Sequence, residues 1–433
     1  MINKINYYFY KENILEGGNI LFLLGVLFLP SALPISGLFL LPALFISFIK
    51  KNNHILNDKS NYSLFIAIGL ILFSALNISF LNREILLDNF DISLIWINLF
   101  NWLPIFIYFW GFQIYLKTHQ QRILFSKFLL IGTIPVMISF ILHYFFKIYG
   151  PFKTFFGLVV WYQKPLLITG EPVAGLFSNP NYASMWLVLI LPFVIFWLNK
   201  YRKKSMKAIF LFFICLNLIY FIFLTDSRNG IMGIAITIFF IYGLKKFLIF
   251  SSGFISFLYM PKFLQYIFNL DNTIYLVKEK YFLDLTLQSP RIDIWRSALS
   301  FIPKRPIWGW GGSTFPYLHI NNNFGQKEPI NAQHTHNMIL ELAHNFGVPL
   351  TILLSFTLLI FIYKAWKIIF FKYELNQELL LAKTWFIPII VFLFSHLTDI
   401  TFYDGKISIL ISILFAGLKC ILNQKKTIKT NFI

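Results

Sequence analysis

Long apolar segments constrain this chain more than any other feature of its sequence. A helix that crosses a membrane needs about 20 predominantly apolar residues, and such runs recur along the chain with polar or basic residues between them. Of the 433 residues, 58% are hydrophobic and 13% are charged, which lies outside the range of soluble globular domains. The sequence therefore predicts an all-α polytopic membrane protein.

The apolar runs predict about twelve transmembrane helices. The first two are short and share the run Ile20–Ile49, which Pro30 and Pro34 interrupt. The other ten predicted spans are Tyr62–Leu81, Leu94–Leu116, Phe128–Phe146, Tyr182–Leu198, Ala208–Leu224, Gly230–Leu244, Phe247–Tyr259, Val348–Tyr363, Trp385–Ile400 and Ile407–Leu422.

Basic residues test this count, because cytoplasmic loops carry an excess of Lys and Arg. The intervening loops hold acidic residues instead, among them Glu84, Glu171 and Asp226. We therefore predict that both termini are cytoplasmic, and the same rule explains the net charge of +19 without nucleic-acid binding. The basic loops and tail contain Lys50, Lys51 and Lys59; Lys117, Arg122 and Lys127; Lys200, Arg202, Lys203, Lys204 and Lys207; Lys245 and Lys246; Lys364, Lys367, Lys372 and Lys383; and Lys425, Lys426 and Lys429.

The segment Gly230–Tyr259 decides on which side the later loops lie. It has the length of one long helix, but two short helices divided at Lys245 and Lys246 keep every later basic cluster cytoplasmic. This interpretation places residues 1–260 in helices 1–9, residues 261–347 in a large outer loop with short helices, and residues 348–433 in helices 10–12 and a cytoplasmic tail. It also places Arg228 and His336 on the same outer face.

His336 is the most informative residue of the large outer loop. It lies in His334-Thr335-His336-Asn337, directly before a predicted helix Met338–Phe346 that ends at Gly347. Histidine is well suited to exchange a proton near neutral pH. We predict no metal site, because His334 and His336 do not share a helix face and no carboxylate stands at the spacing of a zinc-binding helix.

Three arginines are predicted on the same face, and guanidinium groups bind phosphate well. Arg228 lies at the outer end of a span, where an unpaired charge is costly. Arg291 begins an amphipathic helix that also carries Arg296. Anchoring to lipid headgroups, or pairing of Arg228 with Asp226, would explain these arginines equally well. The predicted apolar face of the amphipathic helix, with Trp295 as a membrane anchor, consists of Trp295, Ala298, Leu299 and Ile302.

Two further motifs predict local structure. The glycines in Pro306–Gly312 indicate a tight turn or a close approach of two backbones. The sequence Asn179-Pro180-Asn181 is typical of a turn with an Asn N-cap before a helix. Cys215 and Cys420 both fall in apolar spans, so neither a disulfide nor a metal framework is indicated.

In this order the motifs resemble the O-antigen ligase and polymerase superfamily of bacterial envelope proteins. The resemblance rests on Asn179-Pro180-Asn181, on Ser227-Arg228 before Gly230, on Arg291 with Trp295, on Pro306–Gly312 and on His336-Asn337. It covers most of the chain and is strongest from Gly170 to Gly347. It implies a multi-pass protein of the bacterial inner membrane whose active face is periplasmic.

The resemblance also implies a chemistry. A metal-independent inverting glycosyltransferase without a cofactor would take a glycan from undecaprenyl diphosphate and move it to an acceptor hydroxyl. The acceptor is lipid A-core in ligases, a second lipid-linked glycan in polymerases and a protein Ser or Thr in other relatives. His336 would be the general base, while Arg228 and Arg291, with Arg296 as a third, would hold the diphosphate.

Two other classes of function remain open. A solute transporter, for example of bicarbonate, would place ionisable groups near the middle of the membrane, whereas His143, His396 and Asp399 lie near the ends of predicted spans. A metal-dependent glycosyltransferase would use acidic ligands such as Asp88 and Asp91. The clustering of polar residues in the outer loop favours the metal-independent enzyme.

Overall fold

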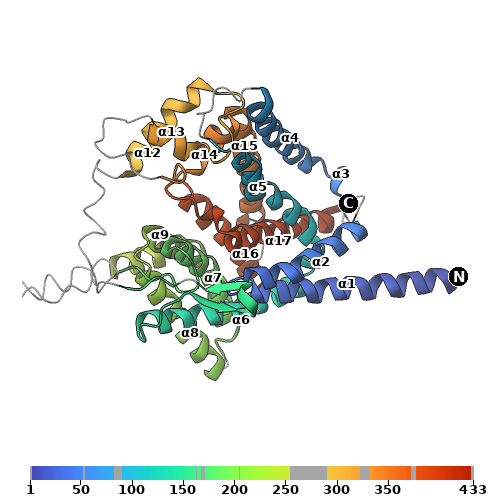
Figure 1. The fold of residues 1–433 in the computed structure, drawn as a ribbon. Helices are drawn as coiled ribbons and strands as arrows, with labels where there is room; N and C mark the ends of the chain where they lie inside the picture. Colours follow the sequence, from blue (N-terminus) through green and yellow to red (C-terminus); the bar gives the residue numbers. More distant parts are fainter. Residues whose placement is uncertain are drawn as a thin grey trace, which may run out of the picture.

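The computed structural model describes residues 2–51, 54–81, 90–161, 163–166, 171–203, 205–253, 290–321, 332–371 and 377–430. These ranges are mostly helical, and one small antiparallel hairpin joins two short strands (Figure 1). Asp88, a metal ligand in the alternative of a metal-dependent enzyme, lies outside the described residues, and so does part of the predicted span Phe247–Tyr259.

The elements follow one another in this order. In the first half they are α1 (Ile2–Phe28), α2 (Leu33–Lys51), α3 (His54–Asn57), η1 (Lys59–Asn61), α4 (Tyr62–Leu76), η2 (Asn77–Leu81), α5 (Ser93–Gly111), η4 (Phe112–Leu116), α6 (His119–Tyr144), β1 (Phe152–Thr154), η5 (Phe155–Gly157), β2 (Val159–Trp161) and α7 (Pro180–Lys200). In the second half they are α8 (Ser205–Leu224), α9 (Arg228–Tyr242), α12 (Pro290–Phe301), η6 (Ile302–Lys304), α13 (Phe315–Asn321), α14 (Met338–Phe346), α15 (Val348–Phe371), α16 (Gln377–Ser395), η7 (Thr401–Tyr403) and α17 (Gly405–Thr430).

Nine helical segments among the described residues are long and apolar enough to cross a membrane, which confirms the all-α polytopic class. Two shorter apolar helices, Ile14–Phe28 and Arg228–Tyr242, coincide with two further predicted spans. The total of twelve remains a prediction. The nine segments are Leu33–Lys50, Lys59–Leu81, Ser93–Leu116, His119–Tyr144, Pro180–Lys200, Met206–Leu224, Val348–Phe371, Gln377–Ser395 and Gly405–Gln424.

Two helices end close to positions at which the sequence predicted an interruption between spans. Helix α1 ends at Phe28 and α2 begins at Leu33, so Pro34 lies in the first turn of a helix, where proline is tolerated. Helix α9 ends at Tyr242, and Gly243 adopts a φ of 84°, a conformation open to glycine, before residues 244–253 turn helical again. The segment that follows Gly230 is therefore not one unbroken helix.

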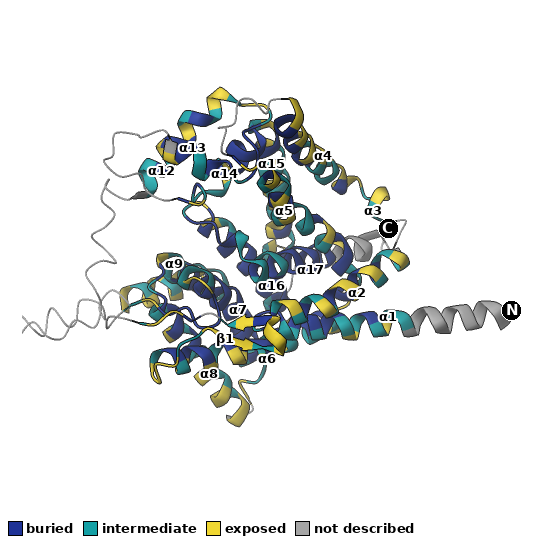
Figure 2. Ribbon diagram, in the orientation of Figure 1, coloured by how far each residue is buried: buried dark blue, intermediate teal, exposed yellow. Residues whose placement is uncertain are grey.

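Helix α7 forms the centre of the core. Its residues from Ala183 to Trp197 are all buried, and a helix that is apolar on every side belongs inside a protein. It packs against α8, α9 and α16. Figure 2 shows the dark blue of buried residues concentrated on α7, α16 and α17, while α12, α13 and α14 lie together at one end of the bundle. The short helices α12, α13 and α14 therefore lie apart from α7, the most buried helix.

Close packing of two helices depends on one glycine. A Cβ atom built at Gly132 in α6 would lie 2.3 Å from the carbonyl oxygen of Leu27 in α1. Small residues allow this close approach between helices in membranes. A Cβ at Gly69 in α4 would meet nothing within 4 Å, so the two glycines differ in their packing while both lie in a helix.

We predict that Gly132→Ala lowers the free energy of unfolding by about 1–3 kcal/mol, because the added methyl group would displace the backbone of α1. Gly69→Ala is the matched control and should be neutral or stabilising by up to ~1 kcal/mol, since alanine favours a helix. Thermal unfolding of both variants in detergent measures the difference. Equal unfolding temperatures would contradict the proposed role of Gly132.

Candidate active site

The histidine loop before α14 is held by local hydrogen bonds. The backbone N–H of His336 donates to Nδ1 of His334 at 3.2 Å, and the backbone of His336 adopts a φ of 53°, which is uncommon for this residue type. Asn337 then caps α14, because its Oδ1 accepts from the N–H groups of Ile339 and Leu340. This confirms the predicted helix Met338–Phe346 with Gly347 at its end.

Asp399 is the partner of His336. Its Oδ1 lies 2.9 Å from Nδ1 of His336 and also accepts from the backbone N–H of Ile400. Burial alone would raise the pKa of Asp399, but the hydrogen bond from His336 and the charge of Arg291 outweigh it, so the pKa is lower than usual. An ionised carboxylate only accepts hydrogen bonds. His336 therefore donates from Nδ1, and in the neutral form of the ring Nε2 carries the lone pair.

Arg291 approaches the other oxygen of the same carboxylate. Its Nη2 lies 3.8 Å from Oδ2 of Asp399. Helix α12 holds it in place, because Ile294 and Ala298 pack on Phe315 and Ala332 in a small cluster of their own. The structure thus brings together Arg291 and His336, two of the four predicted site residues, through a carboxylate from a third part of the chain.

The connection between α16 and η7 carries Asp399, and His396 fixes its shape. The ring of this fully buried histidine donates from Nδ1 to the carbonyl of Phe392 at 2.7 Å and accepts at Nε2 from the N–H of Phe402 at 3.1 Å. Burial lowers the pKa of His396 to about 4. Its own carbonyl accepts from the N–H of Met338, so the connection also contacts the start of α14.

A second buried carboxylate, Glu341, binds the backbone of the histidine loop. It accepts from the backbone N–H of Thr335 at 2.9 Å, from the amide of Asn345 at 2.9 Å and from the hydroxyl of Tyr403. Burial, followed by the charge of Glu341, raises the pKa of Tyr403 well above its usual value, so the phenol stays neutral. The ring of Tyr403 lies 5.5 Å from that of His334.

The glycine-rich run Pro306–Gly312 confirms the predicted close approach of two backbones. A Cβ at Gly309 would lie 2.6 Å from backbone atoms of His344, Asn345 and Phe346. The N–H groups of Trp310 and Gly311 donate to the carbonyls of His344 and Asn345. This contact fixes the carboxyl end of α14, the helix whose amino end carries the histidine loop.

Arg228 is the first residue of α9 and is exposed. Within the described part of the chain, it makes no ion pair with Asp226. The next residue, Asn229, accepts from the hydroxyl of Thr398 at 3.0 Å, one position before Asp399. The start of α9 therefore lies at the connection that carries Asp399, on the same side as Arg291 and His336.

Arg296 is not brought to this cluster. Its Nη1 pairs with Asp293 at 3.2 Å, one turn away on the same helix, and its side chain is 69% exposed. Helix α12 buries Ile294, Ser297, Ala298 and Phe301, whereas Leu299 of the predicted membrane-facing side is 56% exposed. The contact of that side with a membrane stays a prediction. The helix packs its buried face on neighbouring protein segments, which a pattern within one helix could not reveal.

Sequence reasoning missed the roles of Asp399 and Glu341. Asp399 was considered only as an ionisable group near a span end, since 63 positions separate it from His336. The signal that pointed to it was its place at the end of a predicted span, beside a short connection. Glu341 lies one turn into an apolar helix, where a carboxylate needs hydrogen-bond partners.

A metal could find ligand atoms here, contrary to the spacing argument. Atoms of His334, His336 and Asp399 lie within 4.8 Å of one another. However, Nδ1 of His334 accepts from a backbone N–H, and Nδ1 of His336 pairs with Asp399. Both Nδ1 atoms are therefore already engaged in hydrogen bonds. The carboxylate of this cluster comes from a distant part of the chain, so no spacing within one helix could reveal it.

Residues 213–355 match the family model described as O-antigen ligase. The match agrees with the resemblance of the motifs to the O-antigen ligase and polymerase superfamily. It contains Arg228, Arg291 and His336 of the candidate site, whereas Asp399 lies beyond the match. The family and the apolar helices support a multi-pass membrane protein of the ligase or polymerase type that handles a lipid-linked glycan. No curated protein matches the chain.

We predict that the folded protein loses stability between about pH 6.5 and pH 4. In this window an unfolded His396 binds a proton that the folded protein excludes, because burial lowers its pKa to about 4. The free energy of unfolding should fall by on the order of 3 kcal/mol as the pH decreases. The unfolding temperature in detergent, measured across this range, tests the effect.

The variant His396→Asn should show a shallower pH dependence, although it is less stable at neutral pH. The control His119→Asn replaces an exposed histidine at the start of α6, whose pKa burial also lowers but by less, and it should change the slope less than His396→Asn does. Parallel slopes in all three proteins would exclude His396 as the cause.

Proposed function

We propose that the chain transfers a glycan from undecaprenyl diphosphate to an acceptor hydroxyl, that of lipid A-core, on the periplasmic face of the membrane. This proposal rests on the hydrogen bond between His336 and Asp399. Arg291 lies close to the other oxygen of the same carboxylate. A proton acceptor and a cation that can bind phosphate then lie beside each other. The O-antigen ligase match supports the class of reaction.

His336 would be the general base. Its Nε2 takes the proton of the acceptor hydroxyl while the oxygen attacks the anomeric carbon of the donor sugar. The bond from that carbon to the diphosphate oxygen breaks, and attack from the opposite side inverts the configuration. Asp399 keeps the proton of the neutral ring on Nδ1 and stabilises the imidazolium that forms, which is the role of the carboxylate in other His–Asp pairs.

His336 is better placed for this role than His334. His334 uses Nδ1 to accept from the backbone of its neighbour. Burial, and then the proximity of His336, lowers the pKa of His334, so this ring remains neutral. We therefore infer that His334 shapes the loop and that His336 exchanges the proton.

Arg291 and Arg228 would hold the diphosphate. Guanidinium groups form strong, directional hydrogen bonds with phosphate, and they would stabilise the charge that develops on the leaving group. Arg291 is 3.8 Å from Asp399 on one side, which leaves other N–H groups for a ligand. Arg296 is the least supported third member, because its ion pair with Asp293 directs it to solvent.

A repeat-unit polymerase is the second candidate, because the same residues would act on a hydroxyl of another lipid-linked glycan. The envelope glycan of a deletion strain separates the two. Loss of all long chains from lipid A indicates a ligase, and a single attached repeat unit indicates a polymerase. A solute transporter is less consistent with a polar cluster in the connections at one end of the helices.

We predict that His336→Ala, Arg291→Ala and Arg228→Ala each reduce transfer by about a hundred- to a thousandfold, as expected for the loss of a general base or a preorganised donor. Arg296→Ala should reduce it less than tenfold. The rate of glycan transfer by the purified protein, together with the glycan ladder of cells at equal protein level, measures these losses.

Lys304→Ala is the matched control, since it removes an exposed cation near the end of the same helical segment and should leave the rate unchanged. His334→Ala should reduce transfer less than His336→Ala does. Unchanged transfer in His336→Ala or Arg228→Ala at normal protein level would contradict the proposed role of that residue.

We also predict that a strong chelator leaves the transfer rate unchanged, because the proposed step needs no Lewis acid beside the arginines. The experiment compares rates before and after treatment with excess EDTA and then with added Mg²⁺ or Zn²⁺. Loss of activity on chelation, restored by a metal, would favour a metal-dependent glycosyltransferase in place of the mechanism proposed here.

A further inference from the structure

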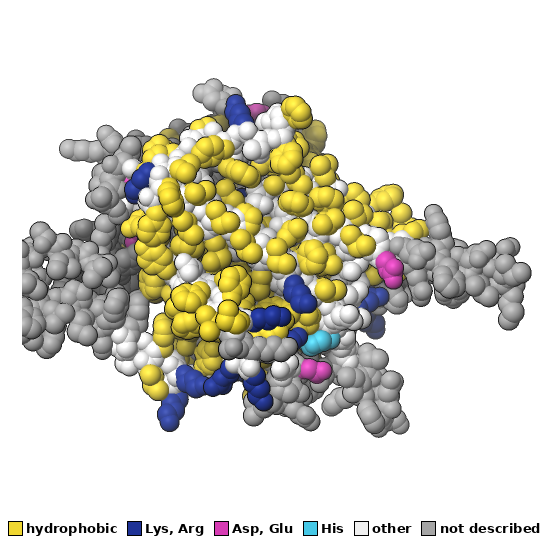
Figure 3. Space-filling view, turned by 90° about the horizontal axis from the view of Figure 1, so that it is seen from below, with side chains coloured by type: hydrophobic (Ala, Val, Ile, Leu, Met, Phe, Trp, Pro, Cys, Tyr) yellow, Lys and Arg dark blue, Asp and Glu magenta, His cyan; other side chains and the backbone are white. Residues whose placement is uncertain are grey.

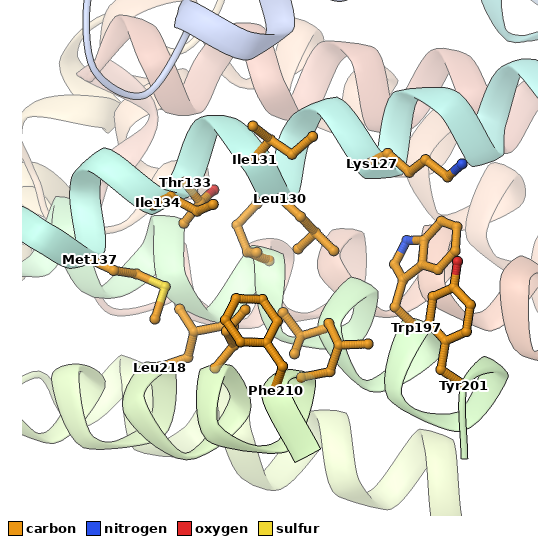
Figure 4. Close-up of a pocket in the computed structure, with 14 residues that line it drawn as sticks. Lys127, Leu130, Ile131, Thr133, Ile134, Met137, Trp197, Tyr201, Phe210 and Leu218 are labelled. Atoms are coloured by element: carbon orange, nitrogen blue, oxygen red, sulfur yellow. The ribbon is translucent and has the colours of Figure 1, made fainter. Parts of the chain in front are cut away.

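An apolar groove opens on the flank of the bundle, apart from the candidate active site. Helices α6 and α8 form its walls and α7 forms its floor, with a volume of about 280 Å³ (Figure 4). Its lining residues are Lys127, Leu130, Ile131, Thr133, Ile134, Met137, Ile190, Val194, Trp197, Tyr201, Phe210, Leu211, Ile214 and Leu218.

Water is a poor occupant of this groove. A buried water needs two to four polar partners, and the lining is almost entirely hydrocarbon and aromatic. The hydroxyl of Thr133 already donates to the carbonyl of Leu129 and accepts from the indole of Trp186. An apolar chain is therefore the better occupant.

One end of the groove is rich in lysine and aromatic side chains. The Nζ of Lys127 lies 5.4 Å from the centre of the Trp197 ring, and that of Lys200 lies 4.9 Å from the same ring. Lys207 lies 5.3 Å from the Tyr201 ring. Figure 3 shows Lys and Arg side chains gathered beside a mainly hydrophobic face of the molecule. Basic groups beside aromatic rings are typical of the level of lipid headgroups.

We propose that the groove binds one acyl chain of an anionic phospholipid, with the lipid phosphate held by Lys127, Lys200 and Lys207. Along α6 the lining runs from Lys127 to Met137, which at 1.5 Å per residue is about 15 Å. This equals half of the ~30 Å hydrocarbon core, the depth of one leaflet. The charge distribution predicts that this leaflet is the cytoplasmic one.

The groove is separate from the site proposed for the glycan donor. The segment before α7 lies beside the start of α17, because Nζ of Lys406 donates to the carbonyl of Leu176 at 2.9 Å. Lys200 ends α7 twenty positions after Pro180, which places the lysine end about 30 Å away along the helix. A diphosphate bound at the outer site cannot also reach these lysines. The proposal therefore does not depend on the proposed function.

The test is native mass spectrometry of the full-length protein purified in mild detergent from membranes that contain phosphatidylglycerol and phosphatidylethanolamine. We expect one phosphatidylglycerol to remain bound per chain. The variant Lys127→Gln/Lys200→Gln/Lys207→Gln should retain at least tenfold less. Its control is Lys246→Gln/Lys364→Gln/Lys367→Gln, which removes three cations outside the groove and should retain the lipid.

A second pair of variants tests the acyl-chain site. Ile134→Trp fills the groove, whereas Ile138→Trp places the same side chain one turn further along α6, where Ile138 is 49% exposed and does not line the groove. Only Ile134→Trp should release the lipid. Retention by Ile134→Trp would mean that headgroup attraction alone holds it, and equal retention of phosphatidylethanolamine or of a polyprenyl phosphate would overturn the proposal.

The unmodified protein provides a test that does not require any variant to fold. After delipidation, phosphatidylglycerol should raise its unfolding temperature by several degrees, and phosphatidylethanolamine at the same concentration should not. No difference between the two lipids would also contradict the proposal.

Discussion

The candidate site depends on one buried carboxylate, Asp399, which receives contacts from separate parts of the chain. One oxygen accepts from His336 and the other faces Arg291. A buried charge is stable only when such partners satisfy it. The same carboxylate sets the ring tautomer of His336 and holds the arginine near it. Removal of Asp399 would therefore affect the proposed proton acceptor, His336, and the proposed phosphate-binding cation, Arg291, together.

The surrounding structure fixes these contacts by satisfying buried polar groups. His396 binds the backbone on both sides of the Asp399 connection, and Glu341 binds the N–H of Thr335 in the histidine loop. Backbone contacts from Gly309 onward fix the far end of α14. These interactions replace the hydration that the buried polar groups would otherwise need, and they keep side chains from α12, α14 and the α16–η7 connection within reach of one another.

Local sequence patterns predicted most of the helices but only part of the site. Apolar length indicated the spans, and Asn337 with Gly347 marked both ends of α14, because these signals act within a few residues. The superfamily resemblance and the match to residues 213–355 agree. The contact of Asp399 with His336 was not predicted, because it arises from packing between distant segments. The protein contacts of α12 arise in the same way: Ile294 and Phe301 are buried by neighbours that no periodicity within the helix identifies.

The central claim is that Asp399 acts through His336 as its orienting partner. A double-mutant cycle on the glycan transfer rate tests this most directly, with His336→Ala, Asp399→Asn and the combined variant at equal protein level. Residues that work as a unit show strongly non-additive losses. The account predicts that the double variant is no slower than His336→Ala alone. Losses that multiply in the double variant would show that the two residues act independently and would contradict the account.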